Sequence, residues 1–356
     1  MIKNEEILLL HNNQIADFSI SEDENKIAYV YGNLDLPHSV YLSDIKKWEI
    51  RIFDNENRSA CRTFFKEFDQ HSPSFSHDGS KLAFLSLIHS KVQLNVYDFQ
   101  KESIILTTDL QYTGPNPFYD VLSKDIYWSI DDRYIVTYYY EKGIDYYKVP
   151  NDFTQSMLVI DIKNMSSKEH LKSNIPYKIH GFFEPLGVAF QKGKHLWIYN
   201  IETFETSPLN VFNHEVIRFV KRDGLFADVD INRIYCGRND QVIAESLIDG
   251  EQIKAIDIAY DGHYAIFVVY KKMSVFLVKL MKTGDVLYLS KENEVVYHKD
   301  SHAGPKCTKK GVFFVKSSSK IHHEFFMFEN EEVNQVSNFN TSIVSNIQVD
   351  IKADEF

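Results

Sequence analysis

The stretch YYYEKGIDYY, residues 138 to 147, is the part of the sequence whose side chains are best suited to binding a ligand. Its candidate binding residues are aromatic or acidic: Tyr139, Tyr140, Glu141, Asp145, Tyr146 and Tyr147. Tyrosine offers a flat apolar ring with a polar tip, and carboxylates attract cationic amines. The pattern therefore predicts a substrate-binding patch for a peptide or an amine. The alternative, in which the tyrosines pack onto their own scaffold, stays open at this point.

No catalytic residue is identified. A hydrolase serine sits at the sharp turn of a Gly-x-Ser-x-Gly motif, and none of the 14 glycines has a serine two positions later. His298, Asp300 and His302 alternate, so they would face the same way in a strand, but a metal site needs further ligands that the sequence does not supply. We interpret them as a solvated loop, and we expect no metal and no other cofactor.

The composition excludes several classes of partner. The 356 residues carry a net charge of -11 with no basic cluster, which would repel phosphate backbones, so we expect no nucleic acid. The amino terminus has only four consecutive apolar residues, far short of a signal-peptide core, and no later window approaches a membrane span, so we expect a cytoplasmic chain with no membrane partner. Cys61, Cys236 and Cys307 are predicted to be inert core thiols of a reducing compartment.

The chain repeats a short pattern. Residues 18 to 29, FSISEDENKIAY, align without a gap on residues 73 to 84, PSFSHDGSKLAF, and a third copy follows in YWSIDDRYIVT. The aligned serines, Ser21, Ser76 and Ser129, are 55 and 53 residues apart. A further copy is DIAYDGHYAIFVV, weaker copies are IHGFFEPLGVAF and FVKRDGLFADVD, and KCTKKGVFFVKS is shorter. The count is seven, and a period of this length is typical of propeller repeats.

Each copy predicts four strands. A short strand meets an Asp-Gly or Asp-rich pair, which we expect to form a tight primed hairpin turn, and an apolar strand returns. A third and a fourth strand follow, as in VQLNVYDFQKESIILTTDL. Four such strands bury both faces only against neighbouring sheets. We therefore predict an all-β fold, a seven-bladed β-propeller of four-stranded antiparallel blades, over residues 1 to 340, with residues 341 to 356 as a terminal strand or linker; the alternative is a β-sandwich.

Two long insertions point to one face of this propeller. Residues 31 to 47 and 139 to 156 both fall between a second and a third strand, and in an up-and-down blade these connections share a face with the connections between blades. Long loops on a rigid scaffold are where binding concentrates. We predict that this face carries function. Residues 4 to 10 are a candidate outer strand for the last blade.

The unit SFSHDGSKLAF resembles the WSPDGxxIAF-type repeat of TolB-like propellers and of the amino-terminal propellers of the prolyl oligopeptidase family, which includes acylaminoacyl peptidases and dipeptidyl peptidases. In that family the catalytic serine, aspartate and histidine lie in an α/β-hydrolase domain, so the resemblance places no catalytic residue on this chain. The dipeptidyl branch holds a substrate's free amino terminus with an adjacent pair of glutamates, and Glu141 and Asp145 do not form such a pair.

The resemblance implies a non-catalytic, substrate-gating propeller of a serine peptidase that binds or filters peptides beside an α/β-hydrolase domain. The alternative is a stand-alone TolB-like scaffold for a protein partner. A third possibility, a propeller enzyme with a central metal, needs a converging set of acidic and histidine ligands that the sequence does not show.

Overall fold

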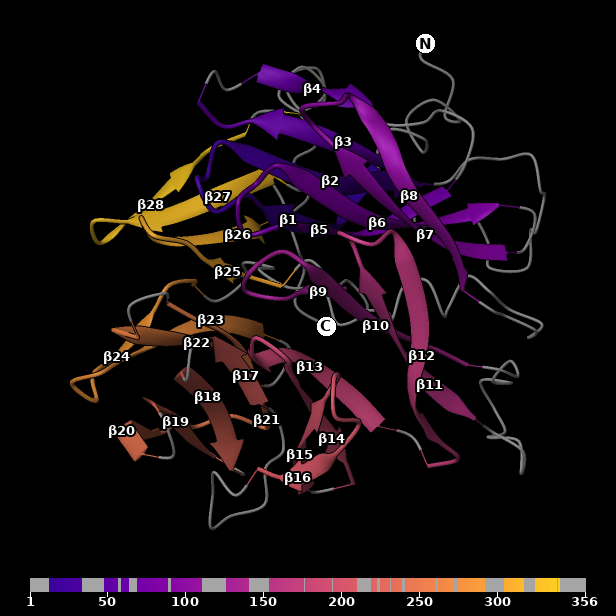
Figure 1. Ribbon diagram of the computed structural model, residues 1–356. Coiled ribbons are helices and arrows are strands. Elements are labelled where there is room, and N and C mark those ends of the chain that lie inside the picture. The colour runs from indigo at the N-terminus through magenta and orange to yellow at the C-terminus, as the bar shows by residue number, and fades with distance from the viewer. Residues whose placement is uncertain are drawn as a thin grey trace.

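A computed structural model describes residues 13–33, 48–56, 59–63, 69–88, 91–110, 126–140, 154–175, 177–193, 195–209, 219–222, 225–230, 232–238, 241–259, 262–271, 274–291, 304–316, 324–337 and 339. These residues form β-strands, turns and short connections, and no helix long and apolar enough to cross a membrane occurs among them. The strands make seven four-stranded antiparallel sheets, arranged as a ring of blades (Figure 1). The predicted seven-bladed propeller is confirmed.

Every blade uses four consecutive strands. The first strands are β1 (Asn13–Ile20), β5 (Asp69–Phe75), β9 (Tyr127–Trp128), β13 (Tyr177–Glu184), β17 (Phe219–Arg222), β21 (Gln252–Ile258) and β25 (Lys306–Cys307). The second strands are β2 (Lys26–Asn33), β6 (Lys81–Ile88), β10 (Tyr134–Tyr140), β14 (Gly187–Lys192), β18 (Leu225–Asp230), β22 (Tyr264–Lys271) and β26 (Val312–Lys316). The third strands are β3 (Trp48–Asp54), β7 (Lys91–Asp98), β11 (Gln155–Asp161), β15 (His195–Asn200), β19 (Arg233–Arg238), β23 (Ser274–Met281) and β27 (Glu324–Glu329). The fourth strands are β4 (Ser59–Thr63), β8 (Ser103–Leu110), β12 (Ser166–Ser173), β16 (Thr206–Pro208), β20 (Gln241–Leu247), β24 (Val286–Tyr288) and β28 (Glu332–Gln335).

The strands confirm the positions predicted for the repeats. The two weakest copies, residues 179 to 190 and 219 to 230, supply the first two strands of blades four and five. The predicted insertions are shorter than expected, because residues 31–33 belong to β2, 139–140 to β10 and 155–156 to β11. Residues 4 to 10 and 341 to 356 lie outside the described residues, so the predictions made for them stay predictions.

The core lies between the blades. Apolar side chains of neighbouring sheets interlock, as between blades one and two, where Ile50 and Trp48 meet Leu82 and Phe84, all of them buried. Burying each such side chain contributes about 1.5–3 kcal/mol. Because a lone sheet would leave these faces in water, the ring is what makes each blade stable.

The repeated serine and aspartate build the turn between the first and second strands. Ser76 Oγ donates to Asp78 Oδ1 at 2.6 Å and accepts from the Lys81 amide at 2.9 Å. Ser21 and Ser129 make the equivalent bonds in blades one and three. Burial alone would raise the pKa of Asp78, but hydrogen bonds from Ser76 and Ser80 outweigh it and hold that pKa below its ordinary value.

The prediction that these turns are primed is wrong. The Gly79 amide donates to the Ser76 carbonyl at 3.0 Å, and only the fourth residue of the turn, Gly79, has a positive φ, of 67°. A primed turn of type I′ would need positive φ at both central residues. The side-chain bonds of Ser76 and Asp78 hold a longer loop instead, and the residues at the same position in blades one and three, Glu24 and Asp132, also have positive φ.

The first and last blades meet at a seam, the contact between blade one (β1–β4) and blade seven (β25–β28), which lie side by side in Figure 1. Phe18 and Tyr29 of blade one pack edge-to-face on Phe325 of blade seven, with ring centroids 5.3 and 5.5 Å apart. Phe339, beyond the last strand, stacks on Tyr29 at 5.2 Å. Aromatic pairs of this kind stabilise a fold beyond the contribution of the surface that they bury. Here they join the two ends of the ring.

Candidate functional site

The two faces of the propeller differ in what the chain places on them. We call the face with the hairpins between strands one and two and between strands three and four the turn face. The opposite face, with the connections between strands two and three and between blades, is the insertion face. Residues 34–47, between β2 and β3, and 141–153, before β11, both join strand ends at the insertion face. Strand β1 begins at this face and β28 ends at it, because each blade has four strands.

At the insertion face, side chains form hydrogen bonds with backbone groups of the neighbouring blade, and these bonds hold the strand ends in place. Gln155, at the start of β11, donates to the Tyr177 carbonyl at 2.8 Å and accepts from the Tyr177 amide at 3.0 Å. Between blades one and two, Gln70 of β5 accepts from the Ile50 amide of β3 at 2.9 Å, and Asp69 accepts from the Trp48 amide at 3.0 Å. Each bond ties one blade to the first strand of the next, so the strand that follows each insertion, β3 or β11, is held in place at the insertion face.

The structure describes only the start of the predicted tyrosine-rich patch. Tyr139 lies on β10 with its side chain buried, and its hydroxyl hydrogen-bonds the carboxylate of Glu169 on β12. Tyr139 thus packs into the apolar core between blades two and three, so this residue packs onto its own scaffold, as in the alternative interpretation of this stretch. The backbone of Tyr140 completes β10. Glu141, Asp145, Tyr146 and Tyr147 lie outside the described residues, and so do His298, Asp300 and His302.

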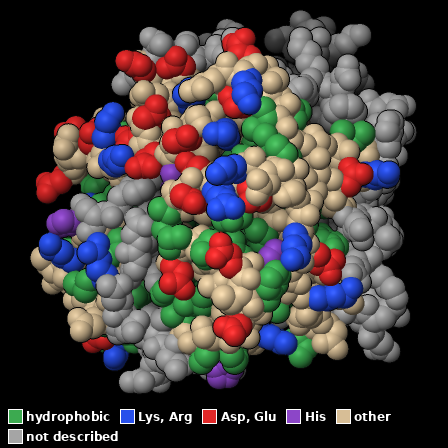
Figure 2. All heavy atoms as spheres, viewed as in Figure 1, with side chains coloured by type: hydrophobic (Ala, Val, Ile, Leu, Met, Phe, Trp, Pro, Cys, Tyr) green, Lys and Arg blue, Asp and Glu red, His purple; other side chains and the backbone are tan. Residues whose placement is uncertain are grey.

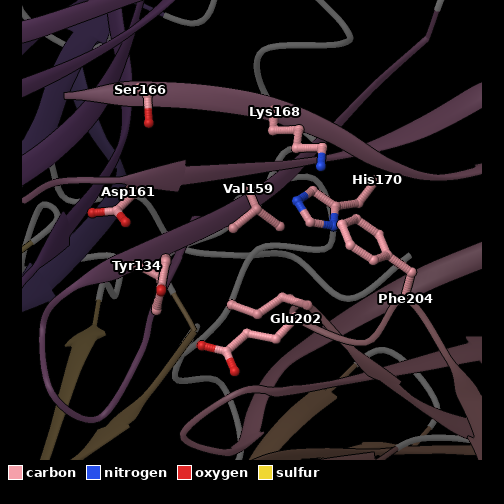
Figure 3. A pocket seen from close by; sticks show the side chains of 9 residues that line it. Tyr134, Val159, Asp161, Ser166, Lys168, His170, Glu202 and Phe204 are labelled. Atoms are coloured by element: carbon pink, nitrogen blue, oxygen red, sulfur yellow. The ribbon is translucent and has the colours of Figure 1, made fainter. Parts of the chain in front are cut away.

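A pocket of ≈ 290 Å³ opens on the turn face between blades three and four (Figure 3). Its floor is Val159, Ile201 and Tyr134, at the outer end of the apolar core that joins the two blades. Polar and aromatic side chains form the walls: Asp161, Ser166, Lys168, His170, Glu202 and Phe204. Strand β12 of blade three supplies one wall and the β15–β16 turn of blade four supplies the other. The sequence did not predict this pocket, since its walls come from different repeats.

Aromatic contacts order one side of the pocket. The His170 ring stacks on Phe204, with centroids 5.2 Å apart and planes 12° apart, and its Nδ1 lies 3.2 Å from the Tyr199 hydroxyl. Lys168 Nζ lies 4.3 Å from the centre of the Phe204 ring, a cation–π contact. Burial, helped by the charge of Lys168, lowers the pKa of His170 to about 4, so the imidazole is neutral at pH 7.

The other side of the pocket carries a paired charge. Asp161 accepts from Arg133 Nη2 at 3.1 Å and from the Asn164 amide at 3.0 Å. Burial alone would raise the pKa of Asp161, but these hydrogen bonds and the positive charge of Arg133 lower it below its ordinary value. No group of three side chains that could hold a metal ion occurs in the described part of the chain. The pocket is therefore suited to binding by charge and stacking.

The view in Figure 2 shows charged side chains of both signs interspersed, with hydrophobic side chains between them. The net charge of -11 is thus not gathered into one acidic field on this side of the molecule. Attraction of a ligand must come from local groups, since charges farther apart than a Debye length of about 8 Å are screened.

No family model and no curated protein matches the chain. Among solved structures, Pyrococcus horikoshii acylaminoacyl peptidase matches with a TM-score of 0.65 and 16% identity, over 94% of this chain and 54% of that one. The β-propeller domain of the trilobed protease from Pyrococcus furiosus, whose topology is described as open velcro, matches with a TM-score of 0.62 and 16% identity, over 93% and 98%. A prolyl endopeptidase matches with a TM-score of 0.62 and 10% identity, over 92% and 50%.

The chain spans about half the length of the acylaminoacyl peptidase and of the prolyl endopeptidase that it matches. At these identities the likeness concerns the fold, and it confirms the resemblance that the repeat predicted. The described chain is therefore a seven-bladed β-propeller with the fold of the propeller domains of prolyl oligopeptidase-family peptidases.

Proposed function

We propose that this chain is the non-catalytic propeller of a prolyl oligopeptidase-type serine peptidase, that it acts beside an α/β-hydrolase domain, and that its insertion face binds and filters peptides. One observation carries the proposal. Both ends of the ring and the strand ends that flank both insertions lie at the insertion face, so a domain joined to either end and a peptide held by the insertions would share that face. The fold match to about half of an acylaminoacyl peptidase supports it.

The residues proposed to contact a peptide are those of the insertion that follows β10. Tyr146 and Tyr147 are the preferred contacts, because tyrosine offers a large contact area at a modest entropic cost. Glu141 and Asp145 would attract the cationic amine of a peptide, and Tyr140 would extend the aromatic surface. Tyr139, buried in the core between blades two and three, would serve to anchor the insertion.

The test is a double variant, Tyr146→Ala with Tyr147→Ala, measured for binding of an unfolded peptide with a free amino terminus. We expect normal thermal stability and lost binding. The matched control is Tyr288→Ala, an exposed tyrosine on β24 of blade six, which should change neither property. Unchanged peptide binding by the double variant would overturn the proposal for these residues.

The hydrolase partner is tested separately. The purified chain should hydrolyse neither peptides nor esters alone, because a serine nucleophile requires a base and an oxyanion site. Adding the hydrolase domain encoded with or beside this chain should give peptidase activity that prefers short or unfolded peptides. Activity of this chain alone that a serine-directed inhibitor abolishes would contradict the proposal. A stand-alone scaffold would instead bind a folded protein partner and leave the hydrolase domain unbound.

A further inference from the structure

The pocket between blades three and four holds two opposite charges that are not paired. Lys168 Nζ contacts the Phe204 ring, and within the described residues it has no ion pair. The Glu202 carboxylate likewise has no hydrogen bond or ion pair with any described residue, although its backbone amide is bound. Figure 3 shows these two side chains on opposite sides of Val159, which lies on the floor between them.

The remaining charges of the pocket do not compete with this pair. Asp161 is neutralised by Arg133 at 3.1 Å. His170 is neutral at pH 7, since burial lowers its pKa to about 4. A ligand in the pocket therefore meets one cation at one wall, one anion at the other, and an apolar floor between them.

The turn that carries Glu202 is held in place by hydrogen bonds of its own. The Asn200 side chain accepts from the amides of Glu202 and Thr203 at 2.9 and 3.0 Å, which fixes the turn that carries Glu202. Phe204 ends this turn at a φ of 62°, in the left-handed region that bulky residues rarely adopt. Glu102 and Met165, at the equivalent turn position of blades two and three, also have positive φ, so this conformation is a regular feature of the turn. Here it presents the ring to both His170 and Lys168.

We propose that this pocket binds a zwitterion, a free amino acid or a short peptide with both termini free, whose carboxylate meets Lys168 and whose ammonium meets Glu202. The side chain of the ligand would rest on Val159, Ile201 and Tyr134. A volume of ≈ 290 Å³ lies at the lower end of the range for small-molecule sites, which agrees with a ligand of this size. The pocket lies on the turn face, so this proposal does not depend on the function proposed for the insertion face.

The test measures binding of the dipeptide Ala-Phe by calorimetry and compares it with two capped forms. N-acetyl-Ala-Phe lacks the ammonium group and Ala-Phe-amide lacks the carboxylate. We expect each capped form to bind roughly fivefold more weakly, at the upper end of what an exposed ion pair contributes. We also expect binding to weaken as salt is added, because Lys168 and Glu202 are exposed to solvent.

Variants assign each charge. Lys168→Met should bind Ala-Phe and Ala-Phe-amide equally, and Glu202→Gln should bind Ala-Phe and N-acetyl-Ala-Phe equally. The controls are Lys172→Met, on the same strand, and Glu205→Gln, next to the same turn; both should keep the preference for the uncapped dipeptide. The insertion variant Tyr146→Ala, Tyr147→Ala should bind Ala-Phe normally.

The preferred ligand length is determined by comparing the affinities of phenylalanine, Ala-Phe and Ala-Ala-Phe. The ligand that binds most tightly identifies that length. Three results would overturn the proposal: no binding of any of the three, equal binding of the capped and uncapped dipeptides, or a charge preference that survives both Lys168→Met and Glu202→Gln.

Discussion

The Glu24 carboxylate of blade one accepts a hydrogen bond from the backbone amide of Lys310 in blade seven at 3.1 Å, across 286 positions of sequence. Glu24 is buried, and it occupies the fourth position of the Ser21 turn. Asp132 holds the same position in blade three, and it accepts from the amides of His77 and Asp78 in blade two at 2.7 and 2.9 Å. The seam is therefore closed by the same kind of bond that joins two neighbouring blades elsewhere in the ring.

Replacing Glu24 tests this closure. Glu24→Ala removes the charged acceptor of a partly buried hydrogen bond from the Lys310 amide, which should lower the free energy of unfolding by about 1–3 kcal/mol. Glu24→Gln keeps an acceptor oxygen and should cost less. The control is Glu22→Gln, which removes an exposed ion pair with Lys309 at 2.9 Å and should change stability by less than about 1 kcal/mol. Equal stability of all three variants in urea unfolding would contradict this role for Glu24.

The turn position itself is tested at Gly79. Its φ of 67° is unfavourable for a β-branched residue, and an added Cβ would lie 3.4 Å from the Cβ of Ser21. Gly79→Val should therefore lower the free energy of unfolding by about 1–3 kcal/mol. Gly79→Asp should cost less, because Asp132 adopts this conformation at the equivalent position, with a φ of 56°. Melting temperatures of the two variants that agree within error would show that backbone conformation is not what limits this position.

The neutral state of His170 predicts a pH dependence of stability. Its pKa is about 4 in the folded chain, against 6.5 for an ordinary histidine, so between these pH values the unfolded chain binds a proton that the folded chain does not. Because of this residue, the free energy of unfolding falls as the pH decreases from 6.5 to 4. Below pH 4 both states are protonated, and His170 causes no further decrease. His170→Gln should reduce this fall, and His195→Gln, an exposed histidine on β15, is the matched control. A profile of urea midpoints against pH that His170→Gln leaves unchanged would be the contrary result.

Cysteine reactivity gives a further prediction. Burial raises the pKa of Cys236 to about 11, so this thiol is protonated at pH 7 and enclosed by the core of blades five and six. The thiolate is the reactive form, and Cys236 in the folded chain should resist alkylation that proceeds readily in urea. Mass spectrometry of the labelled peptides measures this. Rapid native labelling of Cys236 would mean that blades five and six open easily.

The propeller could be predicted from the sequence because several copies of the repeat contain the same residues for the turn between their first two strands. Ser21, Ser76 and Ser129 recur with an aspartate two positions later, since both side chains are needed to hold the turn. The contacts between blades were not predicted. Glu24 and Asp132 both accept hydrogen bonds from backbone amides of a neighbouring blade, although they are different residue types. Gly79 occupies the same position without a side chain, so an alignment of the copies does not reveal this role.

The candidate site was predictable only in part. The position of the insertions between second and third strands followed from the period of the repeat. The pocket of the turn face did not, because Lys168 and Glu202 are brought together by the packing of two blades whose outer strands share no sequence pattern. The buried position of Tyr139 depends on Glu169, 30 residues away on β12, and no local pattern reveals such a partner.

The most direct test of peptide binding at the insertion face is photo-crosslinking, which shows on which face a peptide binds. A photoreactive phenylalanine analogue is placed at Tyr146, in the insertion, or at Ile130, an exposed residue on the turn face of the same blade. Each protein is irradiated with a short unfolded peptide that carries a free amino terminus. We predict crosslinking from position 146, which unlabelled peptide should suppress, and little crosslinking from position 130. Crosslinking from position 130 with none from position 146 would contradict the claim that the insertion face binds peptides.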